Sequence, residues 1–140
     1  MKNIELFNEY AAAIFATLYE RFPVKQSLDA REICGHHTVD DFGGVVDDSG
    51  RPSRAFDIAL STVEWLGDNG FIALGDRHNF GFRDVVLTAK GLETLNARPD
   101  SLGGKESFGE RILRLLREGS IEVAKETGKA AIAYGTKAML

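Results

Sequence analysis

Apolar residues recur at steps of three and four along several stretches of the chain, as they do in helices that bury one face. The first stretch predicts a helix over residues 4–22, which ends before Pro23 because a residue preceding a proline is displaced from the α region. Asp29 can cap a second helix of barely two turns, and Gly35 can end it. The apolar stripe of the first helix consists of Phe7, Tyr10, Ala11, Ile14, Leu18 and Phe22.

A third helix and a β-hairpin are predicted in the middle of the chain. The helix begins at the N-cap Ser53 and ends at Asn69, where Gly70 can take the left-handed conformation. Two strands follow over 71–75 and 80–88, joined by the polar turn between them. The alternation of the second strand breaks at V-V-L, which predicts either a bulge or burial on both faces.

A fourth, short helix completes the first part of the chain. Thr88 caps it, and it extends to about Asn96. Residues 97–107 have the composition of a linker. We therefore expect residues 4–96 to form one domain, made of helices and a small hairpin.

The remaining residues, 108–140, predict a helical appendage. Ser107 and Glu110 form an S-x-x-E capping box at the start of a long helix. Each glycine inside a helix costs about 1 kcal/mol relative to alanine, so this helix needs a partner that approaches its backbone closely. The glycines are Gly119, Gly128 and Gly135.

A stripe of small residues follows the second half of this helix. The expected partner of the stripe is the same helix of a second copy, which makes the protein a homodimer. The alternative is that the helix folds back on the first helix of its own chain and covers Phe7 and Tyr10. Binding to a membrane surface is less favoured because lysines interrupt the stripe. The stripe consists of Ile121, Ala124, Gly128, Ala131, Gly135 and Met139.

Residues 36–50 show no helical period and predict a long loop with a short strand pair at Val39 and Val45–Val46. Loops of this length within a domain are usually functional or disordered. The loop is acidic and can be a solvated insertion, or it can mimic phosphate toward a basic partner. Calcium is not expected, since the ligand spacing of an EF-hand is missing. The acidic residues are Asp40, Asp41, Asp47 and Asp48.

Cys34, His36 and His37, with Asp40 and Asp41, are residue types that ligate transition metals. All five lie within eight residues, whereas zinc ligands usually come from two elements, so we expect no metal. A Cys–His nucleophile pair is less favoured still, because a thiol at a helix C-terminus is not activated by the helix dipole. No phosphate loop or paired carboxylate set is present, and we expect neither catalysis nor a cofactor.

Composition narrows the class of protein further. The 140 residues carry a formal net charge of −4, and 27% are charged. Residues 1–100 hold 10 basic and 16 acidic side chains, and residues 101–140 hold 7 and 5. Nucleic-acid-binding domains tend to be basic, so this balance weakens that class. A single cysteine and the lack of a signal sequence or an apolar span predict a cytoplasmic protein.

The middle of the chain resembles a winged helix-turn-helix domain. The residues that carry the resemblance are G-F-I after the third helix and L-T-A-K-G-L-E-T-L after the hairpin, which are similar to those of MarR-like and PadR-like bacterial regulators. The resemblance covers about residues 4–96. It implies a mainly α fold with a small β-hairpin, to which the long C-terminal helix is added.

The resemblance also implies contacts with duplex DNA. The recognition helix is Ser53–Asn69, and the hairpin is the wing. The alternative is that its charged residues are ordinary solvated side chains, paired with Asp57, Asp76 or Asp84. The implied DNA-binding residues are Arg51, Ser53 and Arg54 at the helix start, Arg77, His78 and Asn79 at the wing tip, and Arg83 and Lys90 nearby.

Two functions follow from these observations. The first is a DNA-binding transcriptional regulator that dimerises through its terminal helices. The second is a non-catalytic protein-interaction module on the same scaffold, in which the acidic loop 36–50 and the C-terminal helix are the contact surfaces.

Overall fold

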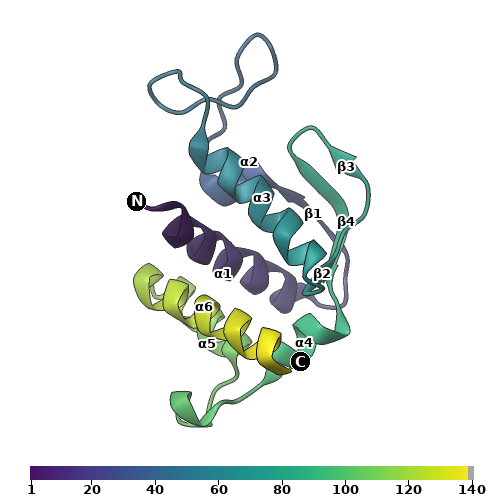
Figure 1. Cartoon of the computed structure of the whole chain (residues 1–140), viewed down its shortest axis with the longest axis vertical. Helices are drawn as coiled ribbons and strands as arrows, with labels where there is room; N and C mark the ends of the chain where they lie inside the picture. The colour runs from purple at the N-terminus through teal and green to yellow at the C-terminus, as the bar shows by residue number, and fades with distance from the viewer. Residues whose placement is uncertain (139–140) are drawn as a thin grey trace.

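The computed structural model describes residues 1–138, and in it one central helix is covered on two sides by other helices (Figure 1). This helix, α1, packs against α3 on one side and against α6 and α5 on the other, while a small sheet lies at one edge. The elements in chain order are α1 (Asn3–Arg21), β1 (Gln26–Asp29), α2 (Ala30–Cys34), α3 (Arg54–Asp68), β2 (Ile72–Ala73), β3 (Arg77–His78), β4 (Gly81–Leu87), α4 (Ala89–Asn96), the 3₁₀ turn η1 (Asp100–Leu102), α5 (Phe108–Arg117) and α6 (Ile121–Ala138).

The second and third helices begin and end where their caps predict. Asp29 accepts a hydrogen bond from the Arg31 backbone at the start of α2, and Gly35 ends it with φ of 79°. Ser53 accepts from the backbone N–H of Phe56 at the start of α3, and Gly70 follows that helix with φ of 78°. These predictions are confirmed, because each cap depends on hydrogen bonds within a few residues.

The sheet has four strands, so the prediction of a two-stranded hairpin was incomplete. β4 pairs antiparallel with β2 and β3, and β1 pairs with its other edge. β3 lies in the segment predicted as a turn. The sequence predicted either a bulge or burial on both faces at V-V-L. The register between β1 and β4 shifts just before that point, where Asp84 has a positive φ of 52°.

Helix α4 lies against the sheet because Gly91 has no side chain. A Cβ atom at Gly91 would stand 2.0 Å from the carbonyl oxygen of Phe71. Thr88 caps the helix by accepting from the Gly91 backbone, and its hydroxyl donates to the carbonyl of Gly70. The predicted N-cap is confirmed, and it also ties α4 to the end of α3.

The chain reverses direction between α5 and α6, so the prediction of one long helix from residue 108 was wrong. Gly119 has a positive φ of 78°, and its N–H donates to Leu116 while that of Ser120 donates to Leu115. This pair of bonds is the left-handed helix ending that glycine favours. The predicted capping box of Ser107 and Glu110 does begin α5.

The two C-terminal helices share one hydrophobic core with the predicted 4–96 domain. Phe108, Ile112 and Ala131 belong to the same buried cluster as Phe15 and Leu18. The last two residues of the predicted 108–140 appendage, and with them Met139 of the small-residue stripe, lie outside the described residues.

The small-residue stripe of α6 packs inside its own chain. A Cβ atom at Gly128 would meet the Cβ of Ala12 on α1 at 3.1 Å, and one at Gly135 would meet the Phe71 ring at 2.6 Å. Ala124 and Ala131 are buried, and only Ile121 of the predicted partner residues that the structure describes is exposed. The stripe therefore has a partner, α1, within the chain, as the alternative from sequence expected.

One detail of that alternative was wrong. Tyr10 packs with Leu6, Ala30 and Ala59, toward α2 and α3, so it is not covered by α6. Phe7 lies at the rim between α1 and α3. Helix α6 covers the Ala12 side of α1, where Ala12 and Gly128 allow the two backbones to approach closely.

Replacing Gly128 with Leu is expected to destabilise the folded chain by about 1–3 kcal/mol or more, since a larger side chain must be forced against Ala12. The free energy of unfolding from urea titration measures this. Ala133→Leu is the matched control, because Ala133 is exposed on the same helix. Equal stability of the two variants would contradict the packing of α6 on α1.

Candidate functional site

The predicted wing residues lie on the surface of the hairpin. Arg77, Asn79 and Arg83 are exposed, and the Arg77 guanidinium lies 5.6 Å from the centre of the Phe82 ring. His78 is half-buried, and its Nδ1 accepts from the backbone N–H of residue 80 at 3.3 Å. Among the described ion pairs none involves Arg77 or Arg83, so both are available to a ligand.

The residues predicted at the start of α3 serve the fold more than a ligand. Ser53 is only 2% exposed. Its hydroxyl caps the helix and also forms a hydrogen bond with Nδ1 of His36. Arg54 donates to the backbone carbonyl of Met1 at 2.9 Å and to the side chain of Asn3. Arg51 is exposed in the loop. The structure therefore brings only Arg51 and Arg54 to the surface here.

Lys90 also has a structural role. Its Nζ donates to the carbonyl oxygen of Asn69 at 2.9 Å and lies 4.4 Å from the centre of the Phe71 ring. The ammonium group therefore caps the C-terminal end of α3, where the helix dipole favours a cation. The side chain of Lys90 is half-buried, so its charge is only partly exposed to solvent.

The outward face of α3 is acidic. Asp57, Glu64 and Asp68 follow one another at steps of seven and four residues, which puts them on one side of the helix, opposite the buried Leu66. Arg54 is the one basic residue of this helix. Carboxylates repel DNA phosphates, so this face is poorly suited to a major groove.

The loop 36–50 projects beyond α2 and α3 as two short arms (Figure 1). Asp40 accepts hydrogen bonds from the backbone of Phe42 and Gly44, and an isolated bridge joins Val39 to Val45. The side chain of Phe42 at the tip is 97% exposed. In the second arm the hydroxyl of Ser49 donates to Asp47 at 2.6 Å, which lowers the pKa of that carboxyl.

The residues considered as metal ligands do not converge. Across residues 1–138 no group of three or more His, Cys, Asp and Glu side chains is placed to hold a metal ion. His36 is bonded to Ser53, and the Sγ of Cys34 accepts from the backbone N–H of His36 at 3.4 Å. Burial raises the pKa of the Cys34 thiol. A thiol of this kind is a weak nucleophile at neutral pH.

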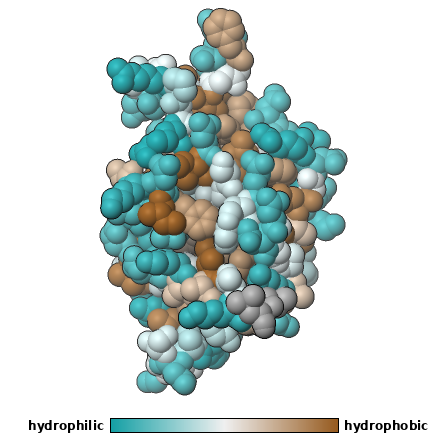
Figure 2. Space-filling model, in the orientation of Figure 1, coloured by the Kyte–Doolittle hydropathy of each residue, from teal (hydrophilic) through white to brown (hydrophobic). Residues whose placement is uncertain are grey.

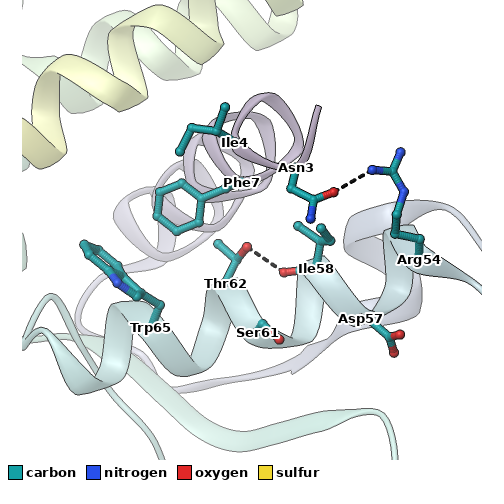
Figure 3. A pocket seen from close by; sticks show the side chains of 9 residues that line it. All are labelled: Asn3, Ile4, Phe7, Arg54, Asp57, Ile58, Ser61, Thr62 and Trp65. Carbon is teal, nitrogen blue, oxygen red and sulfur yellow. Dashed lines mark hydrogen bonds between the residues drawn. The ribbon is translucent and has the colours of Figure 1, made fainter. Parts of the chain in front are cut away.

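A shallow open groove of about 730 Å³ runs between the start of α1 and the outer side of α3 (Figure 3). Its apolar side chains come from both helices: Ile4 and Phe7 from α1, and Ile58 and Trp65 from α3. Ile4 is 60% exposed and Trp65 37% exposed. Figure 2 shows hydrophobic residues gathered near the middle of the same face. The other lining residues are Asn3, Arg54, Asp57, Ser61 and Thr62.

Aromatic contacts hold the groove in shape. The rings of Phe7 and Trp65 are nearly perpendicular with their centres 5.2 Å apart, and Trp65 stacks on the buried Phe71 at 6.4 Å. On the same helix the hydroxyl of Thr62 donates to the carbonyl of Ile58 at 2.6 Å. The groove is thus preformed, as small-ligand and peptide sites usually are.

Sequence reasoning missed this groove. From the sequence we assigned Phe7 to the buried stripe of α1, and we predicted an exposed or binding role for none of Ile4, Ile58 and Trp65. The residue that could have indicated it is Ile58, which is apolar but lies outside the buried stripe of α3 formed by Ala59, Val63 and Leu66. Such a residue outside the stripe indicates a second apolar side of the helix.

Comparisons with family models, with curated proteins and with solved structures found no match. Within residues 1–138 no helix has the length and apolar character needed to cross a membrane. The site is therefore interpreted from its own geometry and charge.

Alkylation of Cys34 by iodoacetamide should be slower in the folded protein than in the chain unfolded by denaturant. The raised pKa leaves less thiolate at a given pH, so the rate of the folded protein should keep rising beyond the pH at which the unfolded chain levels off. Rates measured between neutral and alkaline pH test this. Coincident pH profiles would contradict the effect of burial.

Proposed function

We propose that the protein acts by binding another protein, without catalysis, and that the groove between α1 and α3 is the contact surface. The observation that carries the proposal is the preformed apolar lining with Ile4 and Trp65 exposed at its rim. Full burial of one large apolar side chain contributes about 1.5–3 kcal/mol. Several such side chains on one rigid surface are the usual anchors of a protein interface.

The charge of α3 supports the same function. In a winged helix that reads DNA, the outward face of the recognition helix enters the major groove. Here that face carries Asp57, Glu64 and Asp68, and Arg54 is engaged by the first residues of the chain. A protein partner tolerates these carboxylates, whereas a phosphate backbone is repelled by them.

The loop 36–50 offers a second contact for a protein partner. Phe42 is held in a fixed turn by Asp40 and projects almost entirely into solvent. The C-terminal helix was the other contact surface predicted from the sequence. Because its small-residue face packs against α1, we assign the contact with a partner to this loop and to the groove.

A photo-crosslinking residue placed at Ser61, which lines the groove and is exposed, should form adducts with a partner protein in cells. Trp65→Ala in the same chain should remove most of these adducts, because it removes the largest apolar anchor. Ser101, exposed in η1, is the control position. Equal adducts at both positions, or adducts with nucleic acid alone, would overturn the proposal.

The second candidate function is duplex DNA binding through the wing. What favours it is the order of elements, in which a helix, strand, two helices and a hairpin follow one another and β1 pairs with β4. The part of this order from α3 to α4 is the one on which the winged-helix resemblance rests. Arg77, Asn79 and Arg83 are exposed on the hairpin. A wing contact of this kind leaves the acidic face of α3 out of the DNA grooves.

If the wing binds DNA, replacing Arg77 and Arg83 together with Ala should weaken binding to random duplex DNA. The slope of log K against log salt should fall in magnitude by about 0.9 for each phosphate that the variant no longer neutralises. Gel shifts from about 50 mM salt upward measure this. Arg98→Ala is the control, since Arg98 pairs with Glu110 away from the hairpin. Absence of binding by the unmutated protein would exclude this second function.

A further inference from the structure

We propose that the groove takes an amphipathic α-helix of the partner protein, apolar on the side that enters the groove and basic on the side that faces α3. This inference rests on the proposed function and adds the chemistry of the partner. It is carried by the shape of the apolar lining and by the acidic side chains along the outward face of α3 beside it.

The apolar lining has the spacing that an incoming helix can match. Ile58 and Trp65 are seven residues apart on α3, which corresponds to about 10.5 Å along the axis. Ile4 and Phe7 are three residues apart on α1 and form the facing row. A helix presents anchors at positions i, i+3, i+4 and i+7, which cover a similar length. The groove is therefore long enough for about two turns of helix.

One carboxylate, that of Asp57, lines the groove on its α3 side. Glu64 and Asp68 lie outside the lining and follow Asp57 at steps of seven and four residues along the outward face of α3. The guanidinium of Arg54, at the other end, donates to Met1 and Asn3. Lysine or arginine side chains on the outer side of a bound helix can reach these three carboxylates.

Apolar contacts and ion pairs contribute differently to the binding of such a helix. An exposed ion pair contributes only about 0.2–1 kcal/mol, so three of them affect the choice of partner more than the affinity. The apolar anchors supply most of the affinity. A second copy of this chain is a poorer occupant, because pairing groove to groove would bring the carboxylates of one α3 against those of the other. An anionic lipid surface is disfavoured for the same reason.

Two matched helical peptides test the proposal with the intact protein. Both are 18-residue sequences with leucine along one face; one has lysine at all remaining positions and its twin has glutamate there. Lysine and glutamate have similar helix propensities, so the peptides differ mainly in charge. The readout is the fluorescence of Trp65, the single tryptophan of the chain, with tryptophan-free peptides.

The lysine peptide should bind with a Kd at least tenfold lower than its glutamate twin at low salt, and the ratio should narrow as salt rises, because exposed charges are then screened. Replacing Asp57→Asn, Glu64→Gln and Asp68→Asn together should remove most of the discrimination. Replacing Asp41→Asn, Asp48→Asn and Glu32→Gln changes the net charge equally at exposed positions away from the groove, and should preserve it.

Three results would overturn the inference. If both peptides bind equally, the groove is an apolar site without charge preference, and the proposed function stands without this partner chemistry. If neither peptide changes Trp65 emission, the groove does not take a helix, and crosslinking from Ser61 still decides the proposed function. If Trp65 emission changes with protein concentration alone, the occupant is a second copy.

Discussion

The packing around Phe71 is the constraint on which the rest of the structure depends. Its ring is fully buried and meets Phe15 of α1 edge to face, Trp65 of α3 in a stack, and the backbone of α6 at Gly135. Its carbonyl oxygen lies where a side chain at Gly91 would stand. Four helices and the start of the sheet therefore meet at one residue, and a change there would affect all of them.

This packing also orients the candidate site. Trp65 stacks on Phe71 and also meets Phe7, and these two contacts position its ring at the groove. Gly128 lets α6 approach α1 closely at Ala12. On the other side of α1, Ile4 and Phe7 line the groove toward α3, and Ile4 is exposed.

The scaffold and its surface point to different partners. The fold is mainly helical with a small antiparallel sheet, as the sequence predicted, and the outward face of α3 carries Asp57, Glu64 and Asp68. A fold places elements, whereas function depends on the side chains that those elements present. In this chain the side chains on α3 suit a basic protein segment better than phosphate, and the exposed arginines are on the hairpin.

Local features of the chain could be predicted without coordinates, because they depend on hydrogen bonds between near neighbours. The caps at Asp29, Ser53, Thr88 and Ser107 are of this kind, and so is the turn at Gly70. Gly119 ends α5 through hydrogen bonds between near neighbours, yet the sequence analysis placed it inside one long helix. A glycine in an apolar pattern is compatible with both a helix interior and a helix end.

Features that join distant parts of the chain were decided only by the tertiary structure. β1 pairs with β4 across more than fifty residues, and the small residues of α6 find α1 of the same chain in place of a second copy. The groove combines Ile4 and Phe7 with Ile58 and Trp65 for the same reason. The periodicity of apolar residues shows that a helix has an apolar side. Which surface covers that side, and along what part of the helix, depends on how all the helices pack together.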